Sequence, residues 1–208
     1  MAQLKYTTKK SSKSSKKKDI QTLHSSKEKN PNNGYILAVD PSLSSTGYAI
    51  LDKIDGDAIR VGRIITHKNI SNPERIRTIY SEITAMIIEN SQINTLVIED
   101  QFMYKNADTL KKLSQLRGVI ILSATLLGVP CFTYTPTQIK KAVTGNGNAD
   151  KNEVYQGIRS FYKHNQMVFN HLYSPNVMAS GKNKNDDISD ALAIGRTHRI
   201  LQEPPGDL

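Results

Sequence analysis

The sequence predicts a mixed α/β domain over residues 35–208, preceded by a basic tail over residues 1–34. Three short apolar segments lie close together in residues 35–66, which is typical of neighbouring strands. Beyond them, segments with apolar residues at every third or fourth position alternate with further short apolar runs. This alternation indicates a mixed sheet flanked by helices, with three antiparallel strands followed by parallel ones.

Most of the positive charge lies in the first 34 residues. They hold nine lysines against Asp19 and Glu28, so they contribute +7 to a net charge of +9. Few of them are apolar, and such a segment cannot bury enough surface to offset the entropy of ordering, so we expect a disordered tail. A flexible basic tail attracts polyanions, although a tail that only aids solubility would have the same composition.

The composition excludes several classes of protein. No apolar run approaches the ~20 residues that a membrane-spanning helix needs, so we expect no membrane association. The single cysteine, Cys131, excludes a disulfide framework and zinc sites built on several cysteines. Because such a chain needs no oxidising compartment, we expect it in the cytoplasm.

The first three strands are expected at 35–39, 47–51 and 59–66. The first is the continuous apolar run Tyr35-Ile36-Leu37-Ala38-Val39, which ends at Asp40. Only a few residues separate each strand from the next. Such short connections favour antiparallel pairing.

The rest of the domain is expected to combine helices with two more strands. Asn72-Pro73-Glu74 is typical of a helix start, and apolar residues recur at spacings of three and four as far as Ile87. The fourth strand, residues 95–99, ends on Glu99. The remaining elements are expected as a helix at 107–127, a strand at 131–134, a short helix from Pro136, a helix at 150–162, a long loop at 163–185 and a final helix at 186–201.

Acidic residues stand where this fold favours a ligand site. Asp40 and Glu99 each end a buried strand, and ligands of open α/β sheets bind outside the carboxyl ends of strands. The final helix begins Asp186-Asp187-Ile188-Ser189-Asp190, in which Asp187 and Asp190 share one face. Carboxylates that converge on one point repel each other strongly unless a divalent cation lies among them.

Oxygen ligands without thiolates or paired histidines favour Mg²⁺ or Mn²⁺ over Zn²⁺. Two such ions, about 4 Å apart, promote attack of water on a phosphodiester by activating the water and stabilising the leaving 3′ oxygen. Each carboxylate also has an ordinary structural explanation. Asp40 can begin a turn, Glu99 can be a strand-end charge, and Asp186 or Asp187 can cap a helix. The residue pattern alone leaves both explanations open.

Four blocks of sequence, in family order, resemble the RuvC family of Holliday junction resolvases. Together they extend over nearly all of residues 35–203, and the tail-plus-core arrangement also resembles phage members of that family. The blocks are Ile36–Leu43 with Thr46-Gly47-Tyr48, Ile98–Asp108 with Gln115–Gly118, Lys140–Gly147 with Ala149-Asp150-Lys151, and Asp187–Ile194.

The resemblance implies an RNase H-like fold and a homodimeric, Mg²⁺-dependent endonuclease that resolves four-way DNA junctions by paired nicks. Asp40, Glu99, Asp187 and Asp190 fall on the family's metal-binding catalytic carboxylates, which implies two ions per active site, with Mn²⁺ as a substitute. The resemblance also allows a branch-migration motor as a partner, and a location at the nucleoid or in the cytoplasm of a phage-infected host.

Three further residues fall on DNA-binding positions of the family. Phe102 matches an aromatic that contacts bases near the crossover, where a ring can stack on unpaired bases. Lys140 and Lys151 match basic positions near the active site, where ammonium groups hold or neutralise the scissile phosphate. The alternatives are a core phenylalanine after a strand and solvated lysines at helix ends.

The chain departs from the family pattern in its lysine tail and in the length of the polar loop at 163–185. A longer segment directly before the final helix could change which branched structures the protein admits. Two alternatives to a strict Holliday junction resolvase therefore stay open. One is a broader branched-DNA structure-selective endonuclease, and the other is a junction-binding protein that does not cleave.

Overall fold

The fold was obtained as a computed structural model that describes residues 33–100, 106–172 and 186–202. Its centre is a five-stranded sheet in the order β3-β2-β1-β4-β5. β1, β2 and β3 pair antiparallel, whereas β4 runs parallel to both β1 and β5, which confirms the predicted mixed sheet. The strands are β1 (Tyr35–Asp40), β2 (Ser45–Asp52), β3 (Ala58–Ile65), β4 (Ile93–Glu99) and β5 (Cys131–Tyr134).

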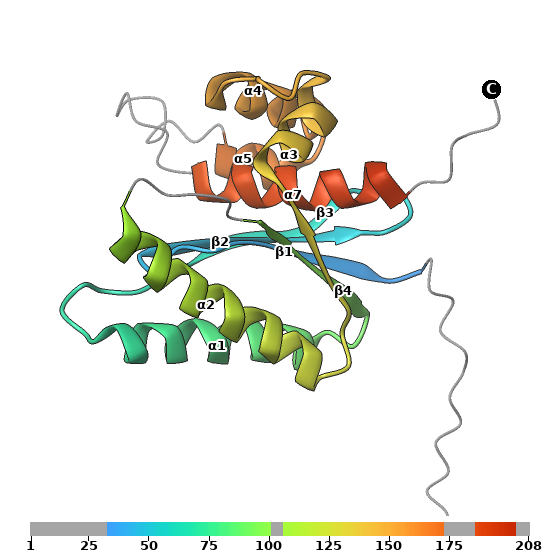
Figure 1. Cartoon of the computed structure of the whole chain (residues 1–208). Coiled ribbons are helices and arrows are strands. Elements are labelled where there is room, and N and C mark those ends of the chain that lie inside the picture. Colours follow the sequence, from blue (N-terminus) through green and yellow to red (C-terminus); the bar gives the residue numbers. More distant parts are fainter. Residues whose placement is uncertain (1–32, 101–105, 173–185, 203–208) are drawn as a thin grey trace, which may run out of the picture.

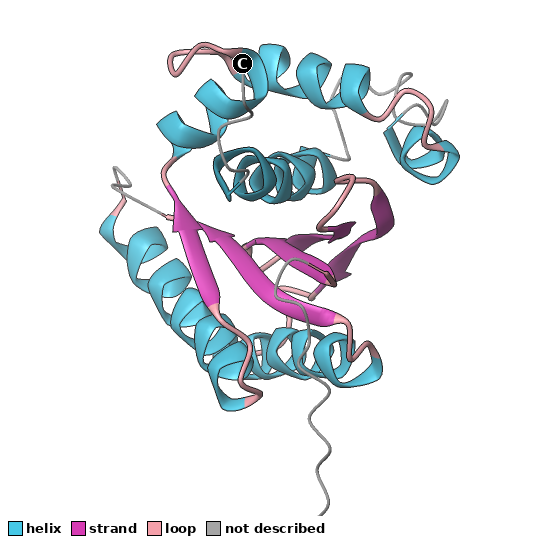
Figure 2. Ribbon diagram, turned by 90° about the vertical axis from the view of Figure 1, so that its right-hand side faces the viewer, coloured by secondary structure: helices cyan, strands magenta, loops and turns pink. Residues whose placement is uncertain are grey.

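Helices cover both faces of the sheet (Figures 1 and 2). One face carries α1 (Asn72–Glu89) and α2 (Ala107–Leu126), and the other carries α7 (Asp186–Gln202). α3 (Pro136–Thr144) and α4 (Lys151–Phe161) pack against α7 on its side away from the sheet. No helix in the described ranges is both long and apolar enough to cross a membrane.

The sheet separates two apolar cores, and β1 contributes to both because its side chains alternate between faces. Leu37 and Val39 pack with the α1/α2 layer, and Ile36 and Ala38 pack with α7. In the α1/α2 core, buried side chains recur at helical spacing, as the sequence predicts. They include Ile79 and Ile83 of α1 and Leu116 and Ile120 of α2.

α7 lies unusually close to the sheet. A Cβ on Gly195 would overlap the Leu51 side chain and would lie 3.0 Å from the Cβ of Ala38. Ala191, Leu192 and Ala193 are also almost fully buried, because α7 is enclosed by the sheet on one side and by other helices on the other. This tight packing leaves α7 little freedom to shift, so the position of its acidic start is fixed by the core.

The loop expected at 163–185 is partly wrong, because Gln166–Leu172 forms helix α5. The Asn165 side chain accepts a hydrogen bond from the N–H of Val168 at 3.0 Å, which stabilises the start of the helix. Val168 and Leu172 are buried, and the Tyr155 hydroxyl donates to the Leu172 carbonyl at 2.8 Å. Packing of two buried apolar residues thus stabilises a short helix where a loop was expected. Residues 173–185 lie outside the described residues.

Candidate active site

Asp40 and Glu99 lie side by side at one edge of the sheet. They end β1 and β4, which are adjacent parallel strands with Val39 opposite Ile98. Two contacts hold Asp100, the residue after Glu99. The Asp100 N–H donates to the Tyr134 carbonyl at 2.7 Å, and the Asp100 carboxylate pairs with Arg117 at 3.0 Å. The end of β4 is therefore held by β5 on one side and by α2 on the other.

α7 brings a third carboxylate to the same edge. Gly47 of β2 lies opposite Asp40, and a Cβ on Gly47 would overlap the backbone carbonyl of Asp187. The missing side chain at Gly47 lets the start of α7 lie directly against β2, next to the end of β1. There the Ser45 hydroxyl donates to Oδ2 of Asp187 at 2.5 Å. No sequence pattern indicates this contact of Ser45, since 142 residues separate the partners.

Lys151 joins the acidic start of α7 to α4. Its Nζ lies 3.2 Å from Oδ2 of Asp190 and 3.2 Å from Oδ2 of Asp186. Lys151 is thus near the carboxylates, as the resemblance implies. Asp186 was expected only as a helix cap, and its contact with Lys151 is a feature that the sequence analysis missed.

Burial and mutual repulsion disturb the titration of the carboxylates. Burial raises the pKa of Asp40 well above its ordinary value, and the charges of Asp190, Glu99 and Asp187 raise it further. Burial also raises the pKa of Asp190, and Lys151 opposes this change. Asp40 is thus coupled electrostatically to each of the other three predicted carboxylates.

The predicted lysines counteract this repulsion. Burial and the charge of Asp190 raise the pKa of Glu99 to about 7, although Lys151 and Lys140 both act to lower it. Burial alone would lower the pKa of Lys151, but Asp190 and Asp186 more than offset this effect and raise it. The positive charges of Lys140 on α3 and Lys151 on α4 therefore both act on the carboxylates at this edge of the sheet.

The chemistry of this donor set fits an oxygen-seeking divalent cation. Its donors are carboxylate oxygens, and the raised pKa values of Asp40, Glu99 and Asp190 indicate that uncompensated negative charge is costly here. Within the described ranges, no three Asp, Glu, His or Cys side chains stand close enough together to hold one ion as they are placed. The Lys151 ammonium instead lies beside Asp190.

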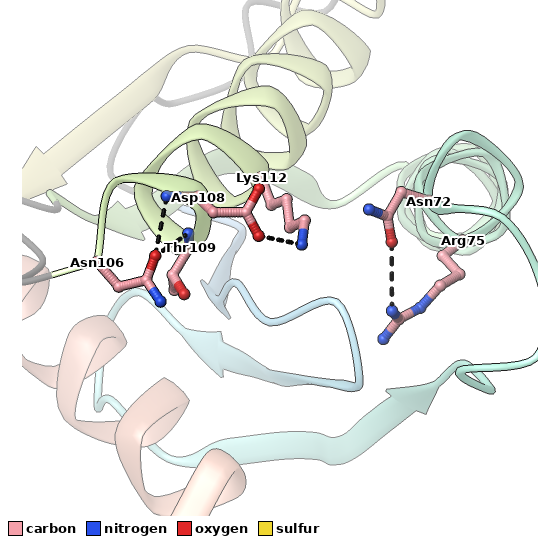
Figure 3. Close-up of polar contacts among 6 residues, drawn as sticks. All are labelled: Asn72, Arg75, Asn106, Asp108, Thr109 and Lys112. Carbon is pink, nitrogen blue, oxygen red and sulfur yellow. Dashed lines mark hydrogen bonds and ion pairs between the residues drawn. The ribbon is translucent and has the colours of Figure 1, made fainter.

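The start of α2 lies at the same end of the molecule as the start of α7 (Figure 1). The Asn106 side chain caps α2 by accepting hydrogen bonds from the N–H groups of Asp108 and Thr109, at 2.9 and 3.4 Å (Figure 3). Asp108 also pairs with Lys112 one turn later (Figure 3). Phe102, the predicted base-stacking residue, lies outside the described residues.

A comparison with protein families identifies the chain. The sequence model described as "Crossover junction endodeoxyribonuclease RuvC" matches residues 36–198, a span that contains all four carboxylates. The chain belongs to the RuvC family. Membership implies a divalent metal cofactor and confirms the expected enzyme class, a crossover junction endodeoxyribonuclease.

Individual RuvC proteins support this assignment over most of their length. The crossover junction endodeoxyribonuclease RuvC of Brevibacillus brevis is 33% identical over 166 residues, which cover 78% of this chain and 90% of the relative. The RuvC protein of Alkaliphilus oremlandii is 34% identical over 166 residues, which cover 78% of this chain and 91% of the relative.

Solved RuvC-type structures confirm the RNase H-like fold. Thermus thermophilus RuvC in complex with a Holliday junction substrate superposes with a TM-score of 0.64 at 21% identity, covering 81% of this chain and 94% of that one. The yeast mitochondrial Holliday junction resolvase superposes with a TM-score of 0.60 at 12% identity, covering 82% of this chain and 79% of that one.

Proposed function

We propose that this protein resolves four-way DNA junctions by paired nicks, and that its four clustered carboxylates hold two Mg²⁺ ions per active site. Mn²⁺ would substitute for Mg²⁺, since both prefer oxygen ligands. The observation that carries the proposal is the convergence of three elements of a RuvC-family fold, which brings acidic groups close enough to raise one another's pKa. The proposed ligands are Asp40, Glu99, Asp187 and Asp190.

The chain's own residues prepare the scissile phosphate for attack. Asp40 and Glu99 are fixed at strand ends, so they present their oxygens from the rigid sheet. Lys140 and Lys151 bring positive charge to the same place, where it stabilises the negative charge on the phosphate. When bound, the ions supply an activated water and neutralise the charge that develops on the leaving 3′ oxygen.

Paired nicks require two active sites, which a homodimer with two-fold symmetry provides. We place Phe102 at the crossover, where its ring stacks on unpaired bases. Branched DNA in the cytoplasm, at the nucleoid or in a phage-infected host, is then the substrate. A branch-migration motor is the corresponding protein partner.

The experiment compares four-way, three-way and linear duplex DNA, with and without Mg²⁺. We expect Mg²⁺-dependent, symmetric nicks in the four-way junction only. Asp40→Asn should abolish them, whereas Glu89→Gln, an exposed acidic residue at the end of α1, should not change the rate. Equal cleavage of three-way DNA would indicate a broader structure-selective endonuclease. Tight junction binding without nicks in any metal would indicate a non-cleaving binding protein.

We also propose that residues 1–34 form a DNA-binding tail on a nuclease domain of residues 35–208. The tail holds +7 of the net charge and none of the proposed catalytic residues. If four of its lysines contact phosphates, deleting residues 1–34 should reduce the log–log salt slope of DNA binding by about 3.6. The cleavage rate at saturating protein and Mg²⁺ should not change, and affinity should fall for all DNA shapes alike. An unchanged slope would leave solubility as the role of the tail.

A further inference from the structure

The turn between β1 and β2 connects the carboxylate site to a buried arginine at the start of α1. Ser45, the first residue of β2, donates its hydroxyl to Oδ2 of Asp187 at 2.5 Å. Ser44, its neighbour, accepts at Oγ a hydrogen bond from Nη2 of Arg75 at 3.0 Å. Two adjacent serines therefore face two different structures, one the start of α7 and the other the start of α1.

Arg75 uses its guanidinium to hold this turn. The residue is only 7% exposed, and its Nε donates to Oγ1 of Thr66 at 2.8 Å. Thr66 in turn donates its hydroxyl to the Leu43 carbonyl and its N–H to the Ser44 carbonyl, the latter at 3.2 Å. The third contact of the guanidinium is with Oδ1 of Asn72, at 3.4 Å (Figure 3).

Arg75 is a buried basic residue that donates its side-chain hydrogen bonds to neutral oxygens. Within the part of the chain that the structure describes, Arg75 forms no ion pair. A buried charge without a carboxylate is costly and is retained only when its donors are well bonded. The rigid fork of a guanidinium bonds neutral oxygens from three separate nitrogens, whereas the three donors of a lysine all lie on one nitrogen. Arg75 thus fits the role of a clamp on the 42–45 turn.

We propose that Ser45 is a positioning residue that orients Asp187, and that Arg75 holds the 42–45 turn where Ser45 makes this contact. The inference rests on the proposed function, because the orientation of Asp187 matters only if Asp187 binds metal. A hydroxyl bonded to one carboxylate oxygen fixes the side-chain rotamer of the ligand. Loss of such an outer partner typically reduces metal affinity 10- to 100-fold.

The first test measures Mn²⁺ binding to the full-length protein without DNA, from the electron paramagnetic resonance signal of free Mn²⁺. Ser45→Ala should weaken binding about 10-fold. Ser45→Thr retains the hydroxyl and should restore most of the affinity. The matched control is Ser81→Ala, an exposed serine of α1, which should bind Mn²⁺ as wild type does. The metal-free melting temperature of Ser45→Ala should stay near the wild-type value, which separates orientation of Asp187 from loss of the fold.

The second test asks whether Arg75 acts through Ser45. Arg75→Lys keeps the charge, but its single nitrogen does not replace donors at three separate positions, so it should weaken Mn²⁺ binding in the same direction. In the Ser45→Ala background it should add no further loss, because two residues acting through one contact are not additive. Ser44→Ala, which removes one Arg75 contact at an exposed residue, gives the same comparison should Arg75→Lys fold poorly. An additive loss in both double variants would overturn the role of Arg75.

Asp187→Asn separates this inference from the proposed function. If Asp187→Asn binds Mn²⁺ as wild type does, Asp187 is not a ligand, and both the proposed metal set and this inference fail. If Asp187→Asn weakens binding and Ser45→Ala does not, the metal set stands and only the positioning role is overturned.

Discussion

The two helical layers cover the same sheet in different ways. α1 and α2 bury one stripe each, through residues such as Ile83 and Leu116, and leave their outer sides exposed. α7 is buried on nearly all sides and lies so close to the sheet that Gly195 has no room for a methyl group. The α1/α2 layer is thus ordinary amphipathic packing, whereas the α7 layer places charged groups at a defined point and tolerates little change.

The charges lie unequally on the two layers as well. The acidic cluster is built from α7 and the strand ends, and its raised pKa values show that it is unfavourable to the metal-free fold. The α1/α2 layer contributes Arg75, whose contacts are with neutral oxygens. Substitutions in the α7 layer near the cluster should therefore change activity, and substitutions in the α1/α2 core should change stability.

The largest expected effect comes from the carboxylates. Asp40→Asn should lower the cleavage rate about a thousandfold, or about 4 kcal/mol of transition-state stabilisation. It should also raise the metal-free melting temperature, because the raised pKa of Asp40 means that its charged form destabilises the fold at neutral pH. Ile79→Val in the α1 core is the opposite case, costing about 1 kcal/mol of stability with an unchanged rate. Cleavage assays and thermal melts of both variants check this contrast, and a lower melting temperature for Asp40→Asn would assign the carboxylate to the fold.

The close packing of α7 predicts the next effect. In Gly195→Ala, the added methyl group would overlap Leu51 and crowd Ala38, so the core must shift. We expect a loss of about 1–3 kcal/mol in the free energy of unfolding, measured by urea denaturation. A neutral result would show that α7 can move away from the sheet, and its acidic start would then not be fixed by packing.

The sequence predicted the elements whose periodicity is strong, and it missed what depends on contacts between distant segments. The five strands and the helices at 72–89 and 186–202 can each be recognised from the apolar runs and spacing within their own segment. α5 was missed because it has only seven residues, which is too short for its apolar positions to show a helical period. Burial of Val168 and Leu172 in the core stabilises it. Local patterns thus specify elements, while packing decides ambiguous segments.

The same distinction applies to the site. Asp40 and Glu99 could be predicted because a strand end is visible in the sequence, and β1 and β4 then bring them together. Two contacts could not be predicted, because each joins segments that only the packing of α7 places side by side. They are Ser45 with Asp187 and Asp186 with Lys151. The base-stacking role of Phe102 stays a prediction.

A smaller effect concerns the other end of α7, where His198 is 5% exposed and shares a hydrogen bond with the Tyr134 hydroxyl at 2.9 Å. Burial and the charge of Lys53 lower the pKa of His198 to about 4, from an ordinary value near 6.5. Between pH 4 and pH 6.5 the unfolded chain binds a proton at His198 that the folded protein does not. The contribution of His198 to the free energy of unfolding is therefore complete above pH 6.5 and is lost as the pH falls toward 4.

The measurement is the difference between the pH profiles of stability for wild type and His198→Gln, since other groups titrate in both proteins alike. Wild type should lose more stability than the variant as the pH falls from 6.5 to 4. Parallel profiles would mean that His198 has the same pKa in the folded and unfolded protein, and that this end of α7 is less enclosed than its exposure indicates.

The smallest expected effect is on the outer side of α2, at Gly118. The place that a Cβ would take there has no heavy atom within 4 Å, in contrast to Gly195 on α7. Alanine is the better residue inside an exposed helix, so Gly118→Ala should raise the free energy of unfolding by about 0.5–1 kcal/mol, with the same rate of junction cleavage.

Leu122 and Leu126 continue this side of α2 at spacings of four residues and are 52% and 68% exposed. They form an apolar stripe that a second copy of the chain would cover if the homodimer packed here. Urea denaturation at several protein concentrations separates the cases. A concentration-independent gain means that solvent covers this side of α2. A loss that grows on dilution means that the proposed homodimer packs here, and that both helical layers are then buried on two sides.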